Sequence, residues 1–346
     1  MPHRNFRQLP ERAVVIHGGM HKTGSSAVQN TFAQNADRLA EAGWLYPRAG
    51  LAFQDATGRR HRKLMIELRK NAGCGSWESL RKEIDAWPGR VIISHENFFS
   101  PQIDPKLLCE QLPGRDIYLM AYLRHPVDYL ESSYREWVRR WRFEGSVDDY
   151  YERRRDYFEL LPLVDAWTNA LGHDRLLLRA YDRQRFVGGS VLSDMLSVLG
   201  IDGLSLPEDP VNNDSLNTTQ TLVYQVANRL RASPARRDQL AGLMPDATEA
   251  ATLLATLRAA NAAEAGISAS KLEALRLVLE DAAAPRRIMD DRLLLQVQQR
   301  HLADFSAVLA AGQDASASCE SAVAKLPHDG AFDQPALREA IAHLLQ

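Results

Sequence analysis

Short, uninterrupted apolar runs alternate with longer amphipathic stretches along the first part of the chain. Four runs are typical of strands: residues 13–16 (AVVI), 91–94 (VIIS), 117–123 (IYLMAYL) and 175–180 (RLLLRA). Because these runs are continuous rather than alternating, they indicate parallel strands that are covered on both faces. Stretches between them, such as 25–42 and 127–141, carry apolar residues at helical spacing. This order predicts an α/β fold, a three-layer sandwich around a mostly parallel central sheet.

The pattern changes beyond the last of these strands, where alanine is frequent and no strand-like run occurs. Three segments there carry apolar residues at helical spacing: 219–232, 269–283 and 290–311. We interpret this part as a helical C-terminal extension packed on the α/β core. The prediction is one domain over 11–310, with the core at 11–205 and the extension at 206–310. Residues 311–346 are expected to form a loop and a last helix at 335–345.

Composition and charge narrow the class of protein. The 346 residues are 45% hydrophobic and 25% charged, which is ordinary for a soluble globular protein with a large core. The net charge of −2 lacks the basic excess of nucleic-acid-binding proteins, so we expect no nucleic-acid partner. The three cysteines form no CxxC pair, which favours a reducing compartment. No apolar run reaches the length of a membrane span or a signal segment, so we expect a cytoplasmic location.

The first strand leads into a glycine-rich turn, 17–26 (HGGMHKTGSS), and then into a helix. Glycines let backbone N–H groups point inward, and the helix N-terminus offers its amides and dipole to an anion. Lys22 adds a mobile positive charge, and Ser25 and Ser26 add hydroxyl donors. A Walker A motif requires Gly-Lys-Ser/Thr, whereas here the lysine precedes Gly24. The turn therefore predicts a phosphate-binding loop and disfavours a magnesium-dependent ATPase or GTPase.

A second candidate anion site follows the strand at 117–123. That strand ends in Arg124, and a helix begins near Pro126. A residue at the carboxyl end of a parallel strand faces the crevice where α/β sheets bind ligands. Ser132 lies two helical turns further on, on a face that can turn back toward Arg124. A guanidinium with a hydroxyl suits a terminal phosphate monoester, although the pair taken alone also fits a surface arginine and a helix serine.

Together the two motifs resemble those of sulfotransferases that use 3′-phosphoadenosine 5′-phosphosulfate, and HxGxHKTGSS is similar to the bacterial and Golgi-type version. In that family an arginine at a strand end and a serine eight positions later hold the 3′-phosphate, the spacing of Arg124 and Ser132. The resemblance covers about residues 13–220 and implies a P-loop NTPase-like sulfotransferase fold. The residues implied to hold the 5′-phosphosulfate are Lys22, Thr23, Gly24, Ser25, Ser26 and Ala27.

The resemblance also implies the reaction. A sulfuryl group would pass from this co-substrate to a hydroxyl or amine acceptor, such as a glycan, a lipid or a small metabolite. No metal is required if lysine and backbone amides carry the charge of the leaving phosphate. Lys22 is the residue that we expect to stabilise that phosphate. The acceptor and the oligomeric state have no signature in the sequence.

A base for the acceptor proton is expected after the strand at 91–94, where the sequence reads SHEN. Neighbouring strand residues point to opposite faces, so His95 and Glu96 cannot both face one acceptor unless the chain turns there. Cytosolic sulfotransferases use a histidine, whereas several carbohydrate and bacterial types use a glutamate, and the SxEN context resembles the latter. We therefore favour Glu96 as the general base, with His95 as the alternative. A purely structural Glu96, capping the next segment or paired with an arginine, is a third interpretation.

Other interpretations stay open. A P-loop small-molecule kinase would need ATP, magnesium and an acidic ligand at a strand end, a part that Glu96 can take. A non-catalytic relative would bind a nucleotide or glycan without transfer. His17 and His21 are four residues apart but lack an HExxH pattern, so we expect no metal site. The arginine- and aromatic-rich run 135–155 fits an amphipathic helix pair with inward aromatics, or an acceptor surface for sugars.

Overall fold

The chain forms two compact units in the computed structural model. The structure describes residues 9–51, 59–70, 75–201, 203–204, 206, 218, 221, 287–311 and 321–326. The first unit comprises 1–129, 155–212 and 299–319, and the second comprises 130–154, 213–298 and 320–346. The predicted single domain over 11–310 stays a prediction. Almost all of the predicted helices at 219–232 and 269–283, and the last helix at 335–345, lie outside the described residues.

The first unit contains a five-stranded sheet in the order β2-β3-β1-β4-β5, with every neighbouring pair parallel. Its strands are β1 (Val14–Gly19), β2 (Trp44–Leu45), β3 (Arg90–Ser94), β4 (Ile117–Leu123) and β5 (Leu176–Ala180). β1 is central, because Val14 lies opposite both Val91 and Ile117. The four predicted strands are confirmed. The two-residue β2 is too short to leave a hydrophobic signal in the sequence.

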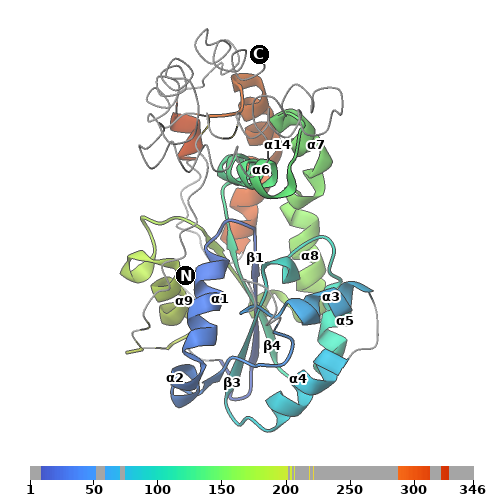
Figure 1. Ribbon diagram of the computed structural model, residues 1–346, viewed down its shortest axis with the longest axis vertical. Helices are drawn as coiled ribbons and strands as arrows, with labels where there is room; N and C mark the ends of the chain where they lie inside the picture. The colour runs from blue at the N-terminus through green and yellow to red at the C-terminus, as the bar shows by residue number, and fades with distance from the viewer. Residues whose placement is uncertain are drawn as a thin grey trace, which may run out of the picture. The chain divides into compact units, whose positions relative to one another are not determined.

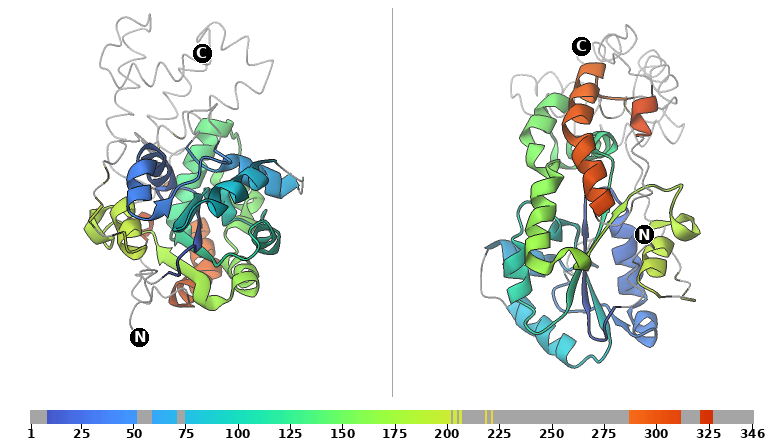
Figure 2. Two further views of the ribbon diagram at one scale, coloured as in Figure 1. Left: turned by 90° about the horizontal axis from the view of Figure 1, so that it is seen from below. Right: turned by 180° about the vertical axis from the view of Figure 1, so that it is seen from behind.

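Helices cover both faces of this sheet. Those of the first unit are α1 (Ser25–Gln34), α2 (Ala36–Glu41), α3 (Arg62–Lys70), α4 (Gly75–Asp85), α5 (Pro105–Glu110), α8 (Leu160–Leu171) and α9 (Val191–Val198). In Figure 1, α1, α2 and α9 lie on one face, and α3, α4, α5 and α8 lie on the other; the views in Figure 2 agree. This arrangement confirms the predicted three-layer α/β fold.

The helix predicted over 25–42 is interrupted at Asn35. The backbone of Asn35 is not helical, with φ −116° and ψ 29°, and its side-chain amide donates to the carbonyl of Thr31 at 2.8 Å. Asparagine side chains compete in this way with the helix hydrogen-bond ladder, so the chain breaks into α1 and α2. The helix that follows the glycine-rich turn therefore ends at Gln34, ten residues after it begins.

The core of the first unit is apolar on both sides of the sheet, as the continuous runs predict. A fully buried carboxylate on α9 interrupts it. Asp194 of α9 is fully buried and accepts a hydrogen bond from the Tyr122 hydroxyl at 2.6 Å. It also accepts two from the Arg179 guanidinium, at 2.9 Å and 2.7 Å. This satisfied network joins β4, β5 and α9 and fixes their mutual positions.

The remaining helices complete the described elements. They are α6 (Pro126–Trp141), α7 (Val147–Arg153) and α14 (Asp291–Ala311), with short 3₁₀ helices η2 (Glu96–Phe98), η3 (Arg155–Tyr157), η4 (His173–Arg175), η5 (Val187–Gly189) and η7 (Val323–Lys325). The helices predicted at 127–141 and 290–311 are thereby confirmed. In the second unit, buried Glu131 accepts hydrogen bonds from the backbone of Ile288 at 2.6 Å and from Arg135 at 2.8 Å. Within the described ranges, no helix combines the length and apolar character needed to cross a membrane.

Candidate active site at the carboxyl ends of the strands

The turn between β1 and α1 has the backbone of an anion-binding loop. Lys22 and Gly24 both adopt the left-handed conformation, with φ of 67° and 76°. Glycine adopts this conformation freely, whereas for a residue with a Cβ, such as Lys22, it costs about 1 kcal/mol of conformational free energy. Backbone strain of this kind is concentrated at functional sites. The Thr23 hydroxyl closes the turn by donating to the Met20 carbonyl at 2.7 Å. Helix α1 starts at Ser25, and its N-cap glycine has no side chain to occupy the first amides.

Gly18, the fifth residue of β1, allows the chain after β3 to approach closely. A Cβ added at Gly18 lies 2.8 Å from both the Cβ and the backbone N of Phe99. We expect Gly18→Ala to lower the free energy of unfolding by about 2 kcal/mol, because backbone atoms must shift to admit the methyl group. Urea denaturation measures this loss. The matched control is Gly75→Ala, where the added Cβ meets nothing within 4 Å. Equal stabilities of the two variants contradict the close approach.

Arg124 follows β4 directly and lies against this loop. Its Nη1 donates to the carbonyl of Lys22 at 2.8 Å, and its guanidinium lies 5.6 Å from the centre of the Tyr181 ring. Burial lowers the pKa of Arg124, opposed by the nearby Asp128 carboxylate, so a partly desolvated cation is held beside the loop. Ser132, its predicted partner, is 7% exposed in α6 and belongs to the second compact unit. The joint role of Arg124 and Ser132 stays a prediction.

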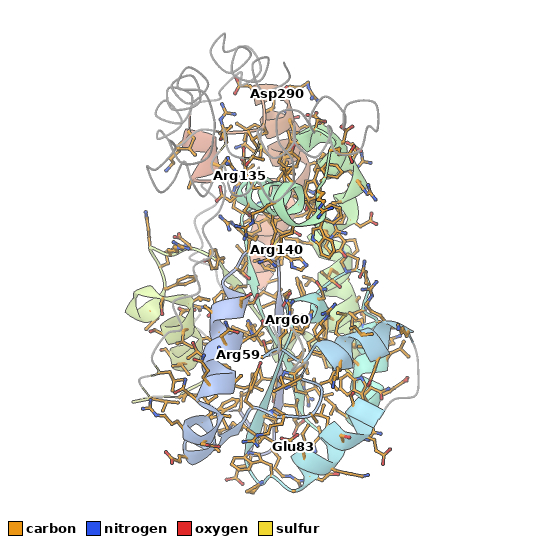
Figure 3. The ribbon with its side chains drawn as sticks, in the orientation of Figure 1. Arg59, Arg60, Glu83, Arg135, Arg140 and Asp290 are labelled. Carbon is orange, nitrogen blue, oxygen red and sulfur yellow. The ribbon has the colours of Figure 1, made fainter. Side chains whose placement is uncertain are left out.

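Glu96 lies where the chain turns after β3. Helix η2 starts there, and the Nδ1 of the N-cap residue His95 accepts a hydrogen bond from the Asn97 amide at 3.1 Å. Glu96 is 8% exposed, and its carboxylate accepts from Arg60 Nη1 at 2.5 Å and from the Gln29 amide at 3.3 Å. The Arg60 side chain, which makes this ion pair, is labelled in Figure 3. Because the chain turns after Ser94, His95 and Glu96 are not consecutive strand residues, and the rule that neighbouring strand side chains point to opposite faces does not apply to them.

The charges around Glu96 keep its carboxyl ionised. Burial alone raises the pKa of Glu96. Electrostatic interactions with His95, His21 and Arg60 outweigh burial and bring the pKa of the Glu96 carboxyl to about 2. Burial lowers the pKa of His95 itself to about 4, although the neighbouring carboxylate acts to raise it. At neutral pH His95 is therefore uncharged, and the Arg60 guanidinium stays as a charged partner of the Glu96 carboxylate.

Two further buried histidines surround Ser94 at the end of β3. His17 is a residue of β1, and its Nδ1 lies 2.8 Å from the Ser94 hydroxyl. His61 Nδ1 accepts from the Ser94 amide at 3.0 Å, and its Nε2 lies 3.0 Å from the Pro47 carbonyl, to which it donates. Burial lowers the pKa of both histidines to about 4, so both are neutral at pH 7. In the part of the chain that the structure describes, no cluster of three or more His, Cys, Asp or Glu side chains is arranged to hold a metal ion.

A narrow pocket lies beside the loop, between the ends of β1 and β3 and the start of α8. Its lining residues are Gly19, Met20, His21, Asn97, Phe99, Ser100, Pro101, Tyr129, Tyr157, Leu160 and Leu163. The side-chain oxygen of Asn97 is buried there without a hydrogen-bond partner among the described residues. A buried acceptor of this kind is costly unless a ligand or water donates to it. With a volume of only about 10 Å³, the pocket holds about one water molecule or one hydroxyl-sized group that donates to this oxygen.

The structure brings together most of the predicted site residues and adds three that the sequence analysis missed. Gln29 is a buried polar residue one helical turn beyond Ser25 on the inner face of α1, so its position in the helix was a usable signal. Arg60 and Tyr181 lie in segments outside the helices and strands and have no comparable signal. Both reach the site only through long-range folding.

Comparisons with known proteins give partial matches. No family model matches the chain. An uncharacterized protein of Archaeoglobus fulgidus is 32% identical over 150 residues, which cover 42% of this chain. The match spans only 41% of the length of that curated relative. Among solved structures, a sulfotransferase from Alicyclobacillus acidocaldarius aligns with 66% of this chain and 100% of its own, at 16% identity and a TM-score of 0.38. Similarity at this level carries no argument about function, which has to come from the site itself.

Proposed function

We propose that this chain is a sulfotransferase, which passes a sulfuryl group from 3′-phosphoadenosine 5′-phosphosulfate to a hydroxyl or amine acceptor. The observation that carries the proposal is the contact between its two anion anchors. Arg124, after β4, donates to the carbonyl of Lys22 in the loop after β1, and β1 and β4 are neighbours in the sheet. One nucleotide with phosphates at both ends of its ribose can therefore reach the loop and the guanidinium at the same edge of the sheet.

The loop residues suit the 5′-phosphosulfate. The first amides of α1, with the hydroxyls of Ser25 and Ser26, supply donors for the oxygens of the phosphate and sulfuryl groups. The Lys22 ammonium neutralises the charge that grows on the 5′-phosphate as it leaves. The bond from sulfur to the phosphate oxygen breaks, a bond from sulfur to the acceptor forms, and adenosine 3′,5′-bisphosphate departs. The positive charge comes from side chains and amides, so the proposed step needs no metal.

Glu96 takes the proton of the acceptor in this proposal. A carboxyl with a pKa of about 2 is a weak base. It suffices here because an acceptor hydroxyl becomes strongly acidic once its oxygen bonds to sulfur, so proton transfer comes late. His95 is the alternative base, and its pKa of about 4 leaves it unprotonated at neutral pH.

Calorimetry with adenosine 3′,5′-bisphosphate tests the donor assignment. We expect this ligand to bind and ATP–magnesium to bind more weakly or not at all. Arg124→Ala is expected to weaken binding of the bisphosphate about 10- to 100-fold, through loss of a charge-assisted contact to the 3′-phosphate. Binding of adenosine 5′-monophosphate, which lacks that phosphate, is the matched control and should change little. Equal losses for both ligands assign Arg124 to support of the loop and contradict a 3′-phosphate site.

Glu96→Gln is expected to lower kcat for sulfate transfer about 100-fold while leaving the affinity for adenosine 3′,5′-bisphosphate unchanged. Transfer of labelled sulfate to a panel of glycans, phenols, lipids and small metabolites supplies the assay. Because the pKa of Glu96 is about 2, kcat of the wild type should show no acid limb from this group between about pH 5 and 8. The control is Glu78→Gln, at an exposed position of α4. If His95→Asn lowers kcat more than Glu96→Gln does, His95 rather than Glu96 is the general base.

A further inference from the structure

The turn between α6 and α7 in the second unit is rigidly built. Arg142 adopts the left-handed conformation with φ 54°, and the Tyr134 hydroxyl donates to the Gly145 carbonyl at 3.1 Å. A Cβ at Gly145 lies 2.7 Å from the tip of the Phe143 ring, so a larger residue there requires that ring to shift. Ser146 then caps α7 in a capping box with Asp149. These contacts hold the segment in one conformation.

Aromatic side chains gather under this turn. The Trp137 ring makes edge contacts with Phe143 at 6.0 Å and with Tyr150 at 5.3 Å between ring centres. The guanidinium of Arg154 lies 4.8 Å from the centre of the Trp137 ring, and that of Arg153 lies 6.0 Å from it. Edge contacts and cation–π pairs fix the orientation of an indole, so Trp137 forms a firm wall.

A cavity of about 640 Å³ opens beside this wall. Its lining residues are Trp137, Trp141, Arg142, Phe143, Glu144, Gly145 and Arg153. The volume falls in the range of roughly 300–1,000 Å³ that is usual for small-ligand sites. Trp141, in the last turn of α6 next to Arg140 (labelled in Figure 3), is 70% exposed, the largest exposure among the exposed large apolar residues of the described chain. Two arginines and a glutamate line the same cavity as this exposed indole.

We propose that this cavity binds an acidic saccharide. A sugar ring presents a face of C–H groups that packs on an aromatic face, here that of Trp141 or Trp137. A sugar carboxylate or sulfate matches the forked donors of Arg142 and Arg153. The Glu144 carboxylate accepts from sugar hydroxyls, and it disfavours a polyanion with a phosphate at every unit. An apolar peptide gains nothing from three charged side chains in the lining. The inference does not rest on the proposed sulfuryl transfer.

Calorimetry with a hyaluronan tetrasaccharide and a heparin tetrasaccharide tests the site in the full chain. We expect at least one of them to bind, and neutral cellotetraose to bind about tenfold more weakly or not at all. Trp141→Ala and Arg153→Gln should each weaken binding about tenfold. Trp141 is exposed, so Trp141→Ala should keep the thermal midpoint of the wild type. Arg140→Gln, on the same helix but outside the lining, is the matched control and should bind as the wild type does.

Several outcomes overturn the inference. One is that neither acidic tetrasaccharide binds the wild type. Another is unchanged binding by a folded Trp141→Ala variant. A third is that cellotetraose binds as tightly as the acidic probes, because the two arginines then do not recognise an acidic group. Tighter binding of a thymidine tetranucleotide, with the same loss in Trp141→Ala, assigns the cavity to single-stranded nucleic acid instead. Because these measurements follow binding alone, a failure here leaves the proposed sulfuryl transfer untouched.

Discussion

Replacing Lys22 by alanine is expected to lower sulfate transfer about 100- to 1,000-fold. The lysine supplies the side-chain cation of the loop, and its loss leaves the negative charge on the departing phosphate without its strongest partner. Alanine carries the same Cβ as lysine, so the left-handed backbone at this position gains no new strain. The fold should therefore survive. Single-turnover transfer from labelled donor measures the effect, and circular dichroism checks the fold.

Two further variants separate charge from backbone at this position. Lys106→Ala, at an exposed position of α5, is the matched control and should transfer sulfate as the wild type does. Lys22→Gly removes both the charge and the left-handed strain, so it should be as inactive as Lys22→Ala but more stable by about 1 kcal/mol. Sulfate transfer by Lys22→Ala at the rate of the wild type refutes the role of Lys22 in the reaction.

Acidification is expected to destabilise the first unit strongly. The pKa values of His17, His61 and His95 are lowered by burial to about 4 from an ordinary value of 6.5. The unfolded chain therefore binds protons that the folded chain does not, and stability falls as the pH drops from about 6.5 to 4. Each histidine contributes on the order of 3 kcal/mol to this loss. Glu96, whose pKa is lowered to about 2, adds a further loss as the pH falls below 4.5.

Urea denaturation at pH 7.5, 5.5 and 4.5 measures this dependence. A loss of several kcal/mol is large against the usual total stability of about 5–15 kcal/mol, so the first unit should unfold near pH 4 without denaturant. His61→Gln should be less stable at pH 7.5, through lost hydrogen bonds, but its stability should vary less with pH. The matched control is His173→Gln at an exposed position, which should keep the slope of the wild type. If the free energy of unfolding of His61→Gln changes as much between pH 7.5 and 4.5 as that of the wild type, His61 is not a buried neutral residue in the folded chain.

The sequence was sufficient to predict the architecture because the strands carry their own signal. Runs such as IYLMAYL have no amphipathic alternation, and the structure buries them between two helical layers. The break at Asn35 was not predicted, since the helical pattern of apolar residues continues through it. β2 was missed because two residues cannot show a period. These errors arise from tertiary contacts and local polar bonds that hydrophobic patterning does not register.

The candidate site was predicted in part, for a comparable reason. The predicted turn 17–26 spans the end of β1, the loop 20–24 and the start of α1, and Arg124 follows β4, so a correct strand assignment also places them. Glu96 lies at a strand end as well, but its partner Arg60 comes from a segment before α3 that carries no motif. The ion pair with Arg60 is one of the interactions that lower the pKa of Glu96, and this pairing needs the folded chain. Sequence reasoning thus located the carboxylate but could not predict its pKa.

The run 135–155 contains aromatic residues that pack inward and one, Trp141, that is exposed. Trp137, Phe143 and Tyr150 pack against one another, as an amphipathic helix pair with inward aromatics predicts. Trp141 departs from that pattern and stays in contact with solvent. Helical spacing alone does not separate these cases, because Trp137 and Trp141 are four residues apart and share one face of the helix. Their different exposure comes from the turn that follows α6.

The central position of β1 sets the order in which the chain can assemble during synthesis. Val14 pairs with Ile117, which leaves the ribosome 103 residues later. At ordinary translation rates that delay is about 5–20 s. One edge of VVIHGG can pair once Val91 of β3 has been made, 77 residues after Val14, and the other edge stays open for the whole interval. The strand that is made early therefore becomes fully paired only when β4 arrives.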